Sequence, residues 1–346
     1  MTTKADVAIV GAGPIGIEMA VALMRAGISY LHFDSKQIGQ TISWFAPQTR
    51  FFSPNERIAI AGVPLQTPDQ SKATREQYLA YLRSVVVQFD LQINTYEPVV
   101  GIERSEDGFV LTTQPARGTK RYWVRKIVLA TGGTDRPRRL NIPGEDLPHV
   151  SHYFQDPHTY FRQKLLIVGG KNSAVEAALR CQQAGAEVSL SYRRAALPEK
   201  SIKYWLMPEI RTLMESGRIA TYFQTIPTRI APGEVTLSRL DGQGDGATQT
   251  IEADFVLLLI GYEQEPTLLR LAGVDLTGPC AAPAHDQQTM ETNVPGIYVA
   301  GTATGGTQER YTVFIENCHV HVQRILASLT GSATPAAPAP IALPES

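Results

Sequence analysis

The sequence has few cysteines and almost no net charge, and both features exclude classes of protein. Its 346 residues contain three cysteines, Cys181, Cys280 and Cys318, at wide spacing. Such spacing provides neither a disulfide framework nor a zinc-binding pattern, and no metal site is expected. The formal net charge of -1 argues against nucleic acid as a partner, because proteins that bind nucleic acids usually carry an excess of basic residues.

Long hydrophobic runs are also missing. The longest, at 255–260, has the length of a strand, whereas a membrane span takes about 18–20 residues. The first ten residues lead directly into a strand pattern and form neither a signal peptide nor an Arg-rich transit peptide. We therefore expect a cytoplasmic protein with no membrane partner. The chain is long enough for two domains, because single cores seldom grow beyond about 250–300 residues.

Residues 6–34 follow the pattern of a dinucleotide-binding unit. The strand pattern DVAIV precedes the turn GAGPIG at 11–16, and a helical stretch and a second strand pattern then end on Asp34. The three glycines allow a tight turn, the approach of a pyrophosphate to the backbone, and close packing of helix on strand. Free N–H groups at the helix start bind the phosphates, and the acidic residue accepts hydrogen bonds from a ribose hydroxyl. The predicted contacts are Gly11, Gly13, Pro14, Ile15, Gly16 and Asp34.

A second unit of the same kind begins at residue 165 and aligns with the first without a gap. Its turn GGKNSA starts at Gly169, 158 positions after Gly11. At this offset Tyr192 replaces Asp34, and two arginines follow. Guanidinium groups suit a 2′-phosphate, which predicts NADPH here; the alternative is a solvated strand end. Lys171 replaces Gly13, so its side chain either points away from the pyrophosphate or contacts it as a cation. The predicted NADPH contacts are Gly169, Gly170, Lys171, Asn172, Ser173, Ala174, Arg193, Arg194, Ile260 and Gly261.

Two further strand patterns identify FAD as the first dinucleotide. KIVLA at 126–130 leads into the turn TGG, and GIYVA at 296–300 leads into the turn GT. Both match the way in which flavoproteins with two dinucleotide sites bring strand ends beneath FAD. A helix predicted at 312–329 would direct its positive end towards the pyrimidine carbonyl of the flavin. The contacts that these turns add are Ala130, Thr131, Gly132, Gly301 and Thr302.

The chain resembles the bacillithiol disulfide reductase (YpdA-type) family, within the thioredoxin-reductase-like flavoproteins that have two dinucleotide-binding domains. The matching stretches are GAGPIG, FFSPNERIAIAGVP from Phe51, TREQYLAYLRSV from Thr74, GGKNSAVEAAL, SIKYWLMPEI from Ser201, ETNVPGIYVAG from Glu291 and FIEN from Phe314. The resemblance implies FAD, NADPH, the reduction of low-molecular-weight disulfides and a homo-oligomer, either a dimer or a tetramer. It also places four more residues at FAD, namely Gln40, Thr41, Val99 and Phe314.

The chain departs from this family where the chemistry of thiols is concerned. It contains no CxxC, and Ile15 stands where family members commonly carry a cysteine. A thiol at the start of a helix is activated by the helix dipole, and an isoleucine offers no such group. Thr302 also replaces the aspartate of the superfamily. Cys318, in the predicted final helix, is the remaining candidate for a redox thiol, and packing in the core is its alternative role.

These patterns predict an α/β protein with two Rossmann-like three-layer domains, the NADPH domain being inserted into a discontinuous FAD domain. The predicted boundaries are 1–150 and 270–330 for the FAD domain, 151–269 for the NADPH domain and 331–346 for a disordered tail. The predicted enzyme passes electrons from NADPH through FAD to an acceptor. The acceptor is either a small disulfide or, without any thiol, a ferredoxin, a flavodoxin, a quinone or an organic C=N or C=C bond. A binding protein that keeps its cofactors for structure is the third hypothesis.

Overall fold

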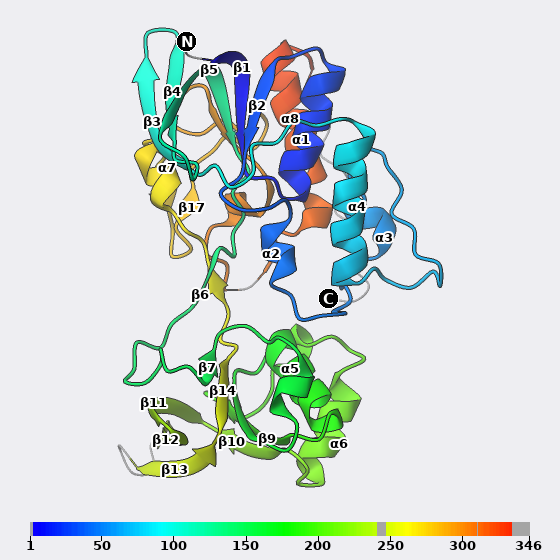
Figure 1. Cartoon of the computed structure of the whole chain (residues 1–346), viewed down its shortest axis with the longest axis vertical. Helices are drawn as coiled ribbons and strands as arrows, with labels where there is room; N and C mark the ends of the chain where they lie inside the picture. Colours follow the sequence, from blue (N-terminus) through cyan, green and yellow to red (C-terminus); the bar gives the residue numbers. More distant parts are fainter. Residues whose placement is uncertain (1–2, 241–246, 310, 334–346) are drawn as a thin grey trace. The chain divides into compact units, whose positions relative to one another are not determined.

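The computed structural model describes residues 3–240, 247–309 and 311–333 (Figure 1). These residues form two compact units. Unit 1 takes the chain up to Trp44, Gln48–Arg136 and the described residues from Tyr262 onward, and unit 2 takes Phe45–Pro47 and Pro137–Gly261. One unit is therefore an insertion into the other, as predicted.

Unit 1 is built on a six-stranded sheet with the order β2-β1-β5-β4-β3, in which β18 also pairs with β5. β1, β2, β5 and β18 are parallel, and β3 and β4 are antiparallel additions at one edge. The strands are β1 (Thr3–Val10), β2 (Tyr30–Phe33), β3 (Val99–Ser105), β4 (Gly108–Thr113), β5 (Lys120–Leu129) and β18 (Ile297–Val299).

Helices cover both faces of this sheet. On one face α1 and α8 lie side by side (Figure 1) and share a core with α4. On the other face α7 contributes Leu269 to a second core beneath β1 and β5. The result is a three-layer unit. Its helices are α1 (Pro14–Arg25), α2 (Gln40–Ser43), α3 (Asn55–Ile58), α4 (Arg75–Gln88), α7 (Thr267–Leu271) and α8 (His319–Thr330).

Unit 2 is a second three-layer unit. Its parallel sheet has the order β10-β9-β8-β14-β7. α5 and α6 pack on one face, and the antiparallel sheet β11-β12-β13 covers the other. The elements are β7 (Val150–Ser151), β8 (Lys164–Val168), α5 (Asn172–Gln183), β9 (Glu187–Tyr192), α6 (Met207–Glu215), β10 (Ala220–Phe223), β11 (Thr225–Ala231), β12 (Gly233–Arg239), β13 (Thr248–Ala253) and β14 (Phe255–Leu258).

Short elements complete the two units. They are β6 (Arg136–Pro137), β15 (Tyr262–Glu263), β16 (Leu276–Thr277) and β17 (Ala282–Pro283), with the 3-10 turns η1 (Pro157–Tyr160), η2 (Glu199–Ser201), η3 (Gly301–Gly305) and η4 (Ile315–Asn317). No described helix has the length and apolar character that a membrane span requires.

The boundaries of unit 2 differ from the predicted 151–269. The unit begins at Pro137, because residues 140–147 pack into its core and the Ile230 N–H donates to the Pro143 carbonyl at 2.9 Å. It ends at Gly261, because Leu269 of α7 is buried in unit 1. Residues 334–346 of the predicted tail lie outside the described part of the chain.

The helix predicted at 312–329 starts later in the structure. Gln308 Oε1 accepts the N–H groups of Thr312 and Val313, at 2.8 and 2.9 Å, and Asn317 Oδ1 accepts that of Phe314 at 2.9 Å. These side chains satisfy the backbone in a loop, so α8 begins only at His319. Cys318 is therefore the N-cap residue of the helix and not part of its second turn.

Candidate functional site: two glycine turns

The three glycines of the first turn are required for different reasons. Gly11 has a φ of 109°, and a Cβ there would overlap the carbonyl oxygen of Ala130. A Cβ on Gly16 would overlap the Gly11 carbonyl. Gly13 differs, because its φ of -77° and ψ of -177° suit any residue and its Cβ would meet nothing within 4 Å. The atoms of the described residues therefore do not require glycine at Gly13, whereas the close approach of a ligand to this backbone would require it.

The helix that follows this turn lacks a side-chain cap. α1 begins at Pro14, and within the described part of the chain no side-chain cap accepts the N–H groups of its first turn. α4, by contrast, starts with a capping box made by Thr74 and Gln77. Pro14 has no N–H, so the free donors of α1 belong to Ile15 and Gly16. A positive helix end next to the open face of Gly13 suits a diphosphate.

Asp34 lies where a ribose hydroxyl is expected. Its two carboxylate oxygens accept the N–H groups of Ala12 at 2.6 Å and Lys36 at 2.8 Å. Burial raises the pKa of Asp34, while these two backbone hydrogen bonds act to lower it. Each oxygen keeps a further lone pair, so the carboxylate can still accept a hydroxyl proton.

The other predicted FAD contacts gather at the same edge of the sheet. The Ala130 N–H donates to Val10 O at 2.8 Å, and the Ala300 N–H donates to Leu129 O at 2.9 Å. These bonds align the ends of β1, β5 and β18, and with them the turns at 130–132 and 301–302. Open α/β sheets bind their ligands at this carboxyl edge.

Backbone hydrogen bonds bring three more predicted residues close to this edge. The Gly39 N–H donates to Ala12 O at 2.9 Å, which places the start of α2, with Gln40 and Thr41, at the first turn. The Glu97 N–H donates to Asp34 O at 2.9 Å and brings the chain that leads to Val99 past the end of β2.

Two buried side chains that hold the turns in place carry no signal in the sequence. His32, fully buried on β2, lies with Nε2 2.9 Å from Gly11 O; burial lowers its pKa to about 4, so its ring is neutral. Gln264, 3% exposed, donates from Nε2 to Gly132 O at 3.2 Å and Ala303 O at 2.9 Å, and so ties the turns after β5 and β18 together. Neither residue belongs to a local motif that would have marked it.

Cys318, the candidate redox thiol, is buried in the core of unit 1. Burial, aided by the charge of Glu18, raises the pKa of its thiol well above the usual range. Sγ donates to Asn317 Oδ1 at 3.8 Å. A reactive cysteine needs an accessible thiolate, and the environment of Cys318 favours the protonated thiol. Cys181 is equally buried, and burial raises its pKa to about 12.

The imidazole ring of His319, the first residue of α8, lies between two hydrogen-bond acceptors. His319 Nδ1 lies 2.7 Å from Glu18 Oε2, and its Nε2 lies 2.9 Å from Arg57 O. Two acceptors require two ring protons, so the pair holds one proton more than a neutral imidazole beside a carboxylate would. Burial acts to lower the pKa of His319, but the hydrogen bond to Glu18, the Glu18 charge and that of Glu316 raise it overall.

This arrangement predicts a stability that declines at alkaline pH. The pKa of His319 is higher in the folded state than in the unfolded state. Its contribution to the free energy of unfolding is therefore complete below the unfolded-state pKa of about 6.5, and it disappears as the pH rises through the folded-state pKa. We expect the difference in unfolding free energy between the parent and His319→Gln to fall by about 1–2 kcal/mol across that range. Urea unfolding of both proteins from pH 5.5 to 9 measures it. A difference that is constant with pH would contradict the charged pair, and Glu18→Gln should show the same loss of pH dependence.

The second glycine turn has a different chemistry around the same backbone path. Gly169 has a φ of 144°, and a Cβ on it would overlap Leu259 O. A Cβ on Gly170 would lie 2.5 Å from the ring of Tyr192, which is buried in the place of an acidic residue. Lys171 has a φ of -113° and a ψ of -170°, close to the path of Gly13. A side chain at this position is thus compatible with the turn, and α5 also starts without a side-chain cap.

The end of β9 presents two exposed cations. Arg193 and Arg194 follow Tyr192 directly, and among the described residues their guanidinium groups make no hydrogen bond or ion pair. Ile260 and Gly261 follow β14, where the Leu259 N–H donates to Val168 O at 2.8 Å, so they lie at the same carboxyl edge. Asn172, another predicted NADPH contact, also holds the chain that follows β9, because its Oδ1 accepts the N–H of Lys203 at 2.7 Å.

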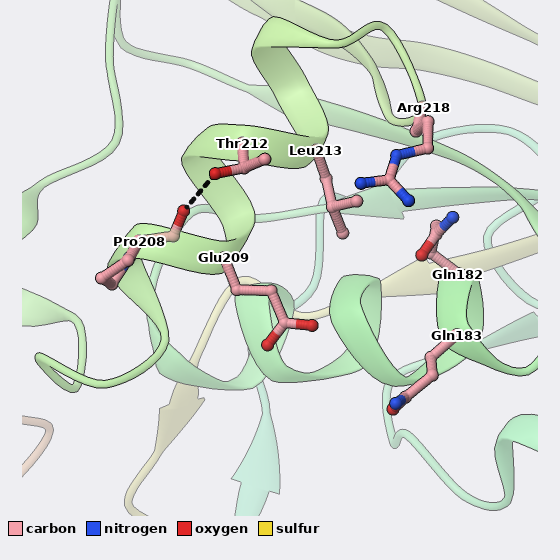
Figure 2. Close-up of a pocket in the computed structure, with 7 residues that line it drawn as sticks. All are labelled: Gln182, Gln183, Pro208, Glu209, Thr212, Leu213 and Arg218. Atoms are coloured by element: carbon pink, nitrogen blue, oxygen red, sulfur yellow. Dashed lines mark hydrogen bonds between the residues drawn. The ribbon is translucent and has the colours of Figure 1, made fainter.

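A pocket of 460 Å³ lies at the other end of α5 (Figure 2). Polar side chains from the end of α5 and from α6 surround it, and Thr212 Oγ1 donates to Pro208 O at 2.9 Å. It is lined by Gln182, Gln183, Pro208, Glu209, Thr212, Leu213 and Arg218. A helix of this length separates its ends by about 18 Å, so this pocket is not part of the glycine turn.

Comparison with known proteins identifies the family. The model of the pyridine nucleotide-disulphide oxidoreductases matches residues 8–301. The chain belongs to this family. Bacilliredoxin reductase Bdr of Bacillus subtilis is 34% identical over 322 residues, which cover 93% of this chain and 96% of that protein. The structure of the bacillithiol disulfide reductase Bdr (YpdA) from Staphylococcus aureus matches with a TM-score of 0.88 at 33% identity, covering 95% of this chain and 99% of that one. These matches confirm the predicted resemblance and the two-domain α/β fold.

A third relative has a different named acceptor. The ferredoxin–NADP reductase of Ignicoccus hospitalis is 27% identical over 309 residues, which cover 86% of this chain and 90% of that protein. Family membership makes the chain an oxidoreductase with FAD and NADPH as its cofactors, which confirms these predictions. It favours the enzyme hypotheses over a binding protein that keeps cofactors for structure.

Proposed function

We propose that unit 1 binds FAD at its glycine turn, that unit 2 binds NADPH at the second turn, and that the enzyme reduces its acceptor without a redox-active cysteine. The open face of Gly13 is the observation that carries the FAD assignment. Asp34 supports it, because a carboxylate accepts an unmodified ribose hydroxyl and repels a 2′-phosphate. The exposed Arg193 and Arg194 support NADPH at the second turn. Bound FAD would supply the redox chemistry, which is the acceptance of hydride from NADPH and the transfer of electrons to the acceptor.

The residues of unit 1 have positioning tasks in this proposal. The N–H groups of Ile15 and Gly16 bind the diphosphate, and Asp34 orients the ribose. Gln264 holds the turns at Gly132 and Ala303 in register, so that the edge that receives FAD keeps its shape. Ile15 is buried and lies against Gly301, since a Cβ added to that glycine would be 3.4 Å from the Ile15 Cβ. The proposal therefore has an apolar side chain, and no thiol, at this position of the turn.

The proposed acceptor is a small redox protein such as a ferredoxin or flavodoxin, or else a quinone or an organic C=N or C=C bond. Ile15 and the buried Cys318 support this thiol-independent route. The relationship to Bdr at 34% identity favours a second candidate, a small disulfide that reacts at the flavin itself. A homo-oligomer, either a dimer or a tetramer, remains part of the proposal.

An acceptor screen tests the thiol-independent route. We expect the NADPH-reduced enzyme to reduce a ferredoxin, a quinone or a cyclic imine faster than bacillithiol disulfide. Because the Cys318 thiol is buried and protonated, Cys318→Ala should keep each rate within about twofold. NADPH consumption with each acceptor measures it.

Cys181→Ala is the matched control, since it removes an equally buried thiol from unit 2. If Cys318→Ala loses disulfide reduction selectively while Cys181→Ala keeps it, a thiol-dependent route replaces the proposed one.

A further inference from the structure

The chain between β9 and α6 is anchored to the start of α5. The Lys203 N–H donates to Asn172 Oδ1 at 2.7 Å, and Lys203 Nζ donates to Glu176 Oε2 at 3.1 Å. Lys203 is only 8% exposed, and the neighbouring Ile202 is buried. Both acceptors lie in the first turns of α5, so this anchor fixes residues 202–205 beside the second glycine turn.

The anchored segment presents a large ring to solvent. Tyr204 is 64% exposed and Trp205 is 37% exposed. Their rings meet edge to face, with centroids 4.9 Å apart and an angle of 89° between their planes. One edge of Tyr204 is thereby braced while much of the ring remains accessible. A rigidly held, exposed aromatic ring is typical of a surface that binds a planar ligand.

The electrostatics of this edge favour an anion. The buried ammonium of Lys203 lies near the positive end of α5, where the helix dipole disfavours a cation, and Glu176 offsets part of that cost. Arg193 and Arg194, at the end of the preceding strand, add two exposed cations. An exposed ring beside a cluster of cations matches the chemistry of a phosphorylated nucleoside.

The topology indicates which half of the dinucleotide the ring meets. In a Rossmann unit the strand that follows the glycine helix ends at the ribose of the adenosine half. That strand is β9 in unit 2, and the anchored segment follows it. We infer that Tyr204 stacks on the adenine ring of NADPH, held in place by the contacts of Lys203 with Asn172 and Glu176. This inference rests on the proposed binding of NADPH at the second turn.

Binding of two ligands to the holoenzyme tests the stacking. NADP+ carries both halves of the dinucleotide, and adenosine 2′,5′-bisphosphate carries only the adenosine half. We expect Tyr204→Ala to raise the dissociation constants for both ligands by a similar factor, about tenfold, because stacking of a base on an aromatic ring is lost. Tyr204→Phe keeps the ring, so its dissociation constants for both ligands should lie within about twofold of those of the parent.

Phe161→Ala is the matched control. Phe161 is another exposed aromatic residue of unit 2, 48% exposed, and it lies against Gly185 beyond the far end of α5. Its removal should leave both dissociation constants unchanged. Unchanged binding of both ligands by Tyr204→Ala would overturn the inference, as would a loss confined to NADP+, which would assign the ring to the nicotinamide half.

A double-mutant cycle tests the anchor. Asn172→Ala removes the acceptor of the Lys203 N–H. It should therefore weaken the binding of adenosine 2′,5′-bisphosphate when Tyr204 is present, and much less in the Tyr204→Ala background. Additive losses would show that the anchor does not act through the ring. If the parent binds no adenosine 2′,5′-bisphosphate and Arg193→Ala/Arg194→Ala leaves the dissociation constant for NADP+ unchanged, the proposed NADPH site itself fails. If the parent binds adenosine 2′,5′-bisphosphate and the arginine variant weakens that binding, the site holds. Unchanged binding by Tyr204→Ala then contradicts the stacking alone.

Discussion

Replacing Gly13 with alanine is expected to weaken FAD binding by about 10- to 100-fold while leaving the fold of unit 1 intact. The backbone of Gly13 adopts a conformation that alanine shares, and the added methyl group meets no atom of residues 3–240, 247–309 and 311–333 within 4 Å. The apoprotein should therefore be as stable as the parent or slightly more stable, by about 0.4–1 kcal/mol, since alanine restricts the unfolded chain. FAD would lose its approach to the backbone.

The flavin content of the purified protein, the dissociation constant for FAD and the thermal unfolding of the apoprotein measure this prediction. Gly16→Ala is the contrasting variant, because its Cβ would overlap the Gly11 carbonyl and should destabilise the apoprotein itself. FAD binding by Gly13→Ala that equals that of the parent would show that the diphosphate does not pass over this residue.

Much of the fold could be predicted because a glycine turn between a strand and a helix depends on local backbone requirements. Gly11 and Gly169 both adopt positive φ values that side chains rarely tolerate, so the sequence marks these turns directly. The alignment of Gly169 with Gly11 likewise predicts two units of one kind. What the pattern does not mark is where each unit closes. Pro137 begins unit 2 because Pro143 and Ile230 share a backbone hydrogen bond, a contact between residues far apart in the chain.

The candidate site shows the same division between local and distant information. Asp34 was predictable because its distance from the turn is fixed by one helix and one strand. Gln264 was not, since its contacts, Gly132 and Ala303, are 132 and 39 residues away. Glu18 and His319 are 301 residues apart, and their pairing depends on the packing of α1 on α8. The late start of α8 also depends on side chains. Gln308 and Asn317 accept backbone N–H groups of a segment before α8 that the apolar spacing alone would assign to a helix.

Removing both arginines at the end of β9 is expected to lower kcat/KM for NADPH by about 100-fold and to change kcat/KM for NADH by less than about threefold. A hydrogen bond to a charged group contributes about 1.5–3 kcal/mol, and exposure to solvent favours the lower end of that range for each arginine. NADH lacks the 2′-phosphate and loses no such contact. Because the phosphate is remote from the reacting ring, the loss should appear in KM while kcat stays constant. Steady-state kinetics of Arg193→Ala/Arg194→Ala with both nucleotides measures this change in preference.

Arg218→Ala/Arg229→Ala is the matched control for this last prediction. It removes the same charge from exposed positions of the same unit, but Arg218 lies at the pocket beyond the far end of α5 and Arg229 lies on β11. A general effect of charge would lower kcat/KM for NADPH in both double variants alike. In both variants this loss would become smaller as the salt concentration rises. A direct contact lowers kcat/KM for NADPH only for Arg193→Ala/Arg194→Ala. If the ratio of NADPH to NADH efficiency is the same in that variant as in the parent, the two arginines are a solvated strand end, and the preference for NADPH has another source.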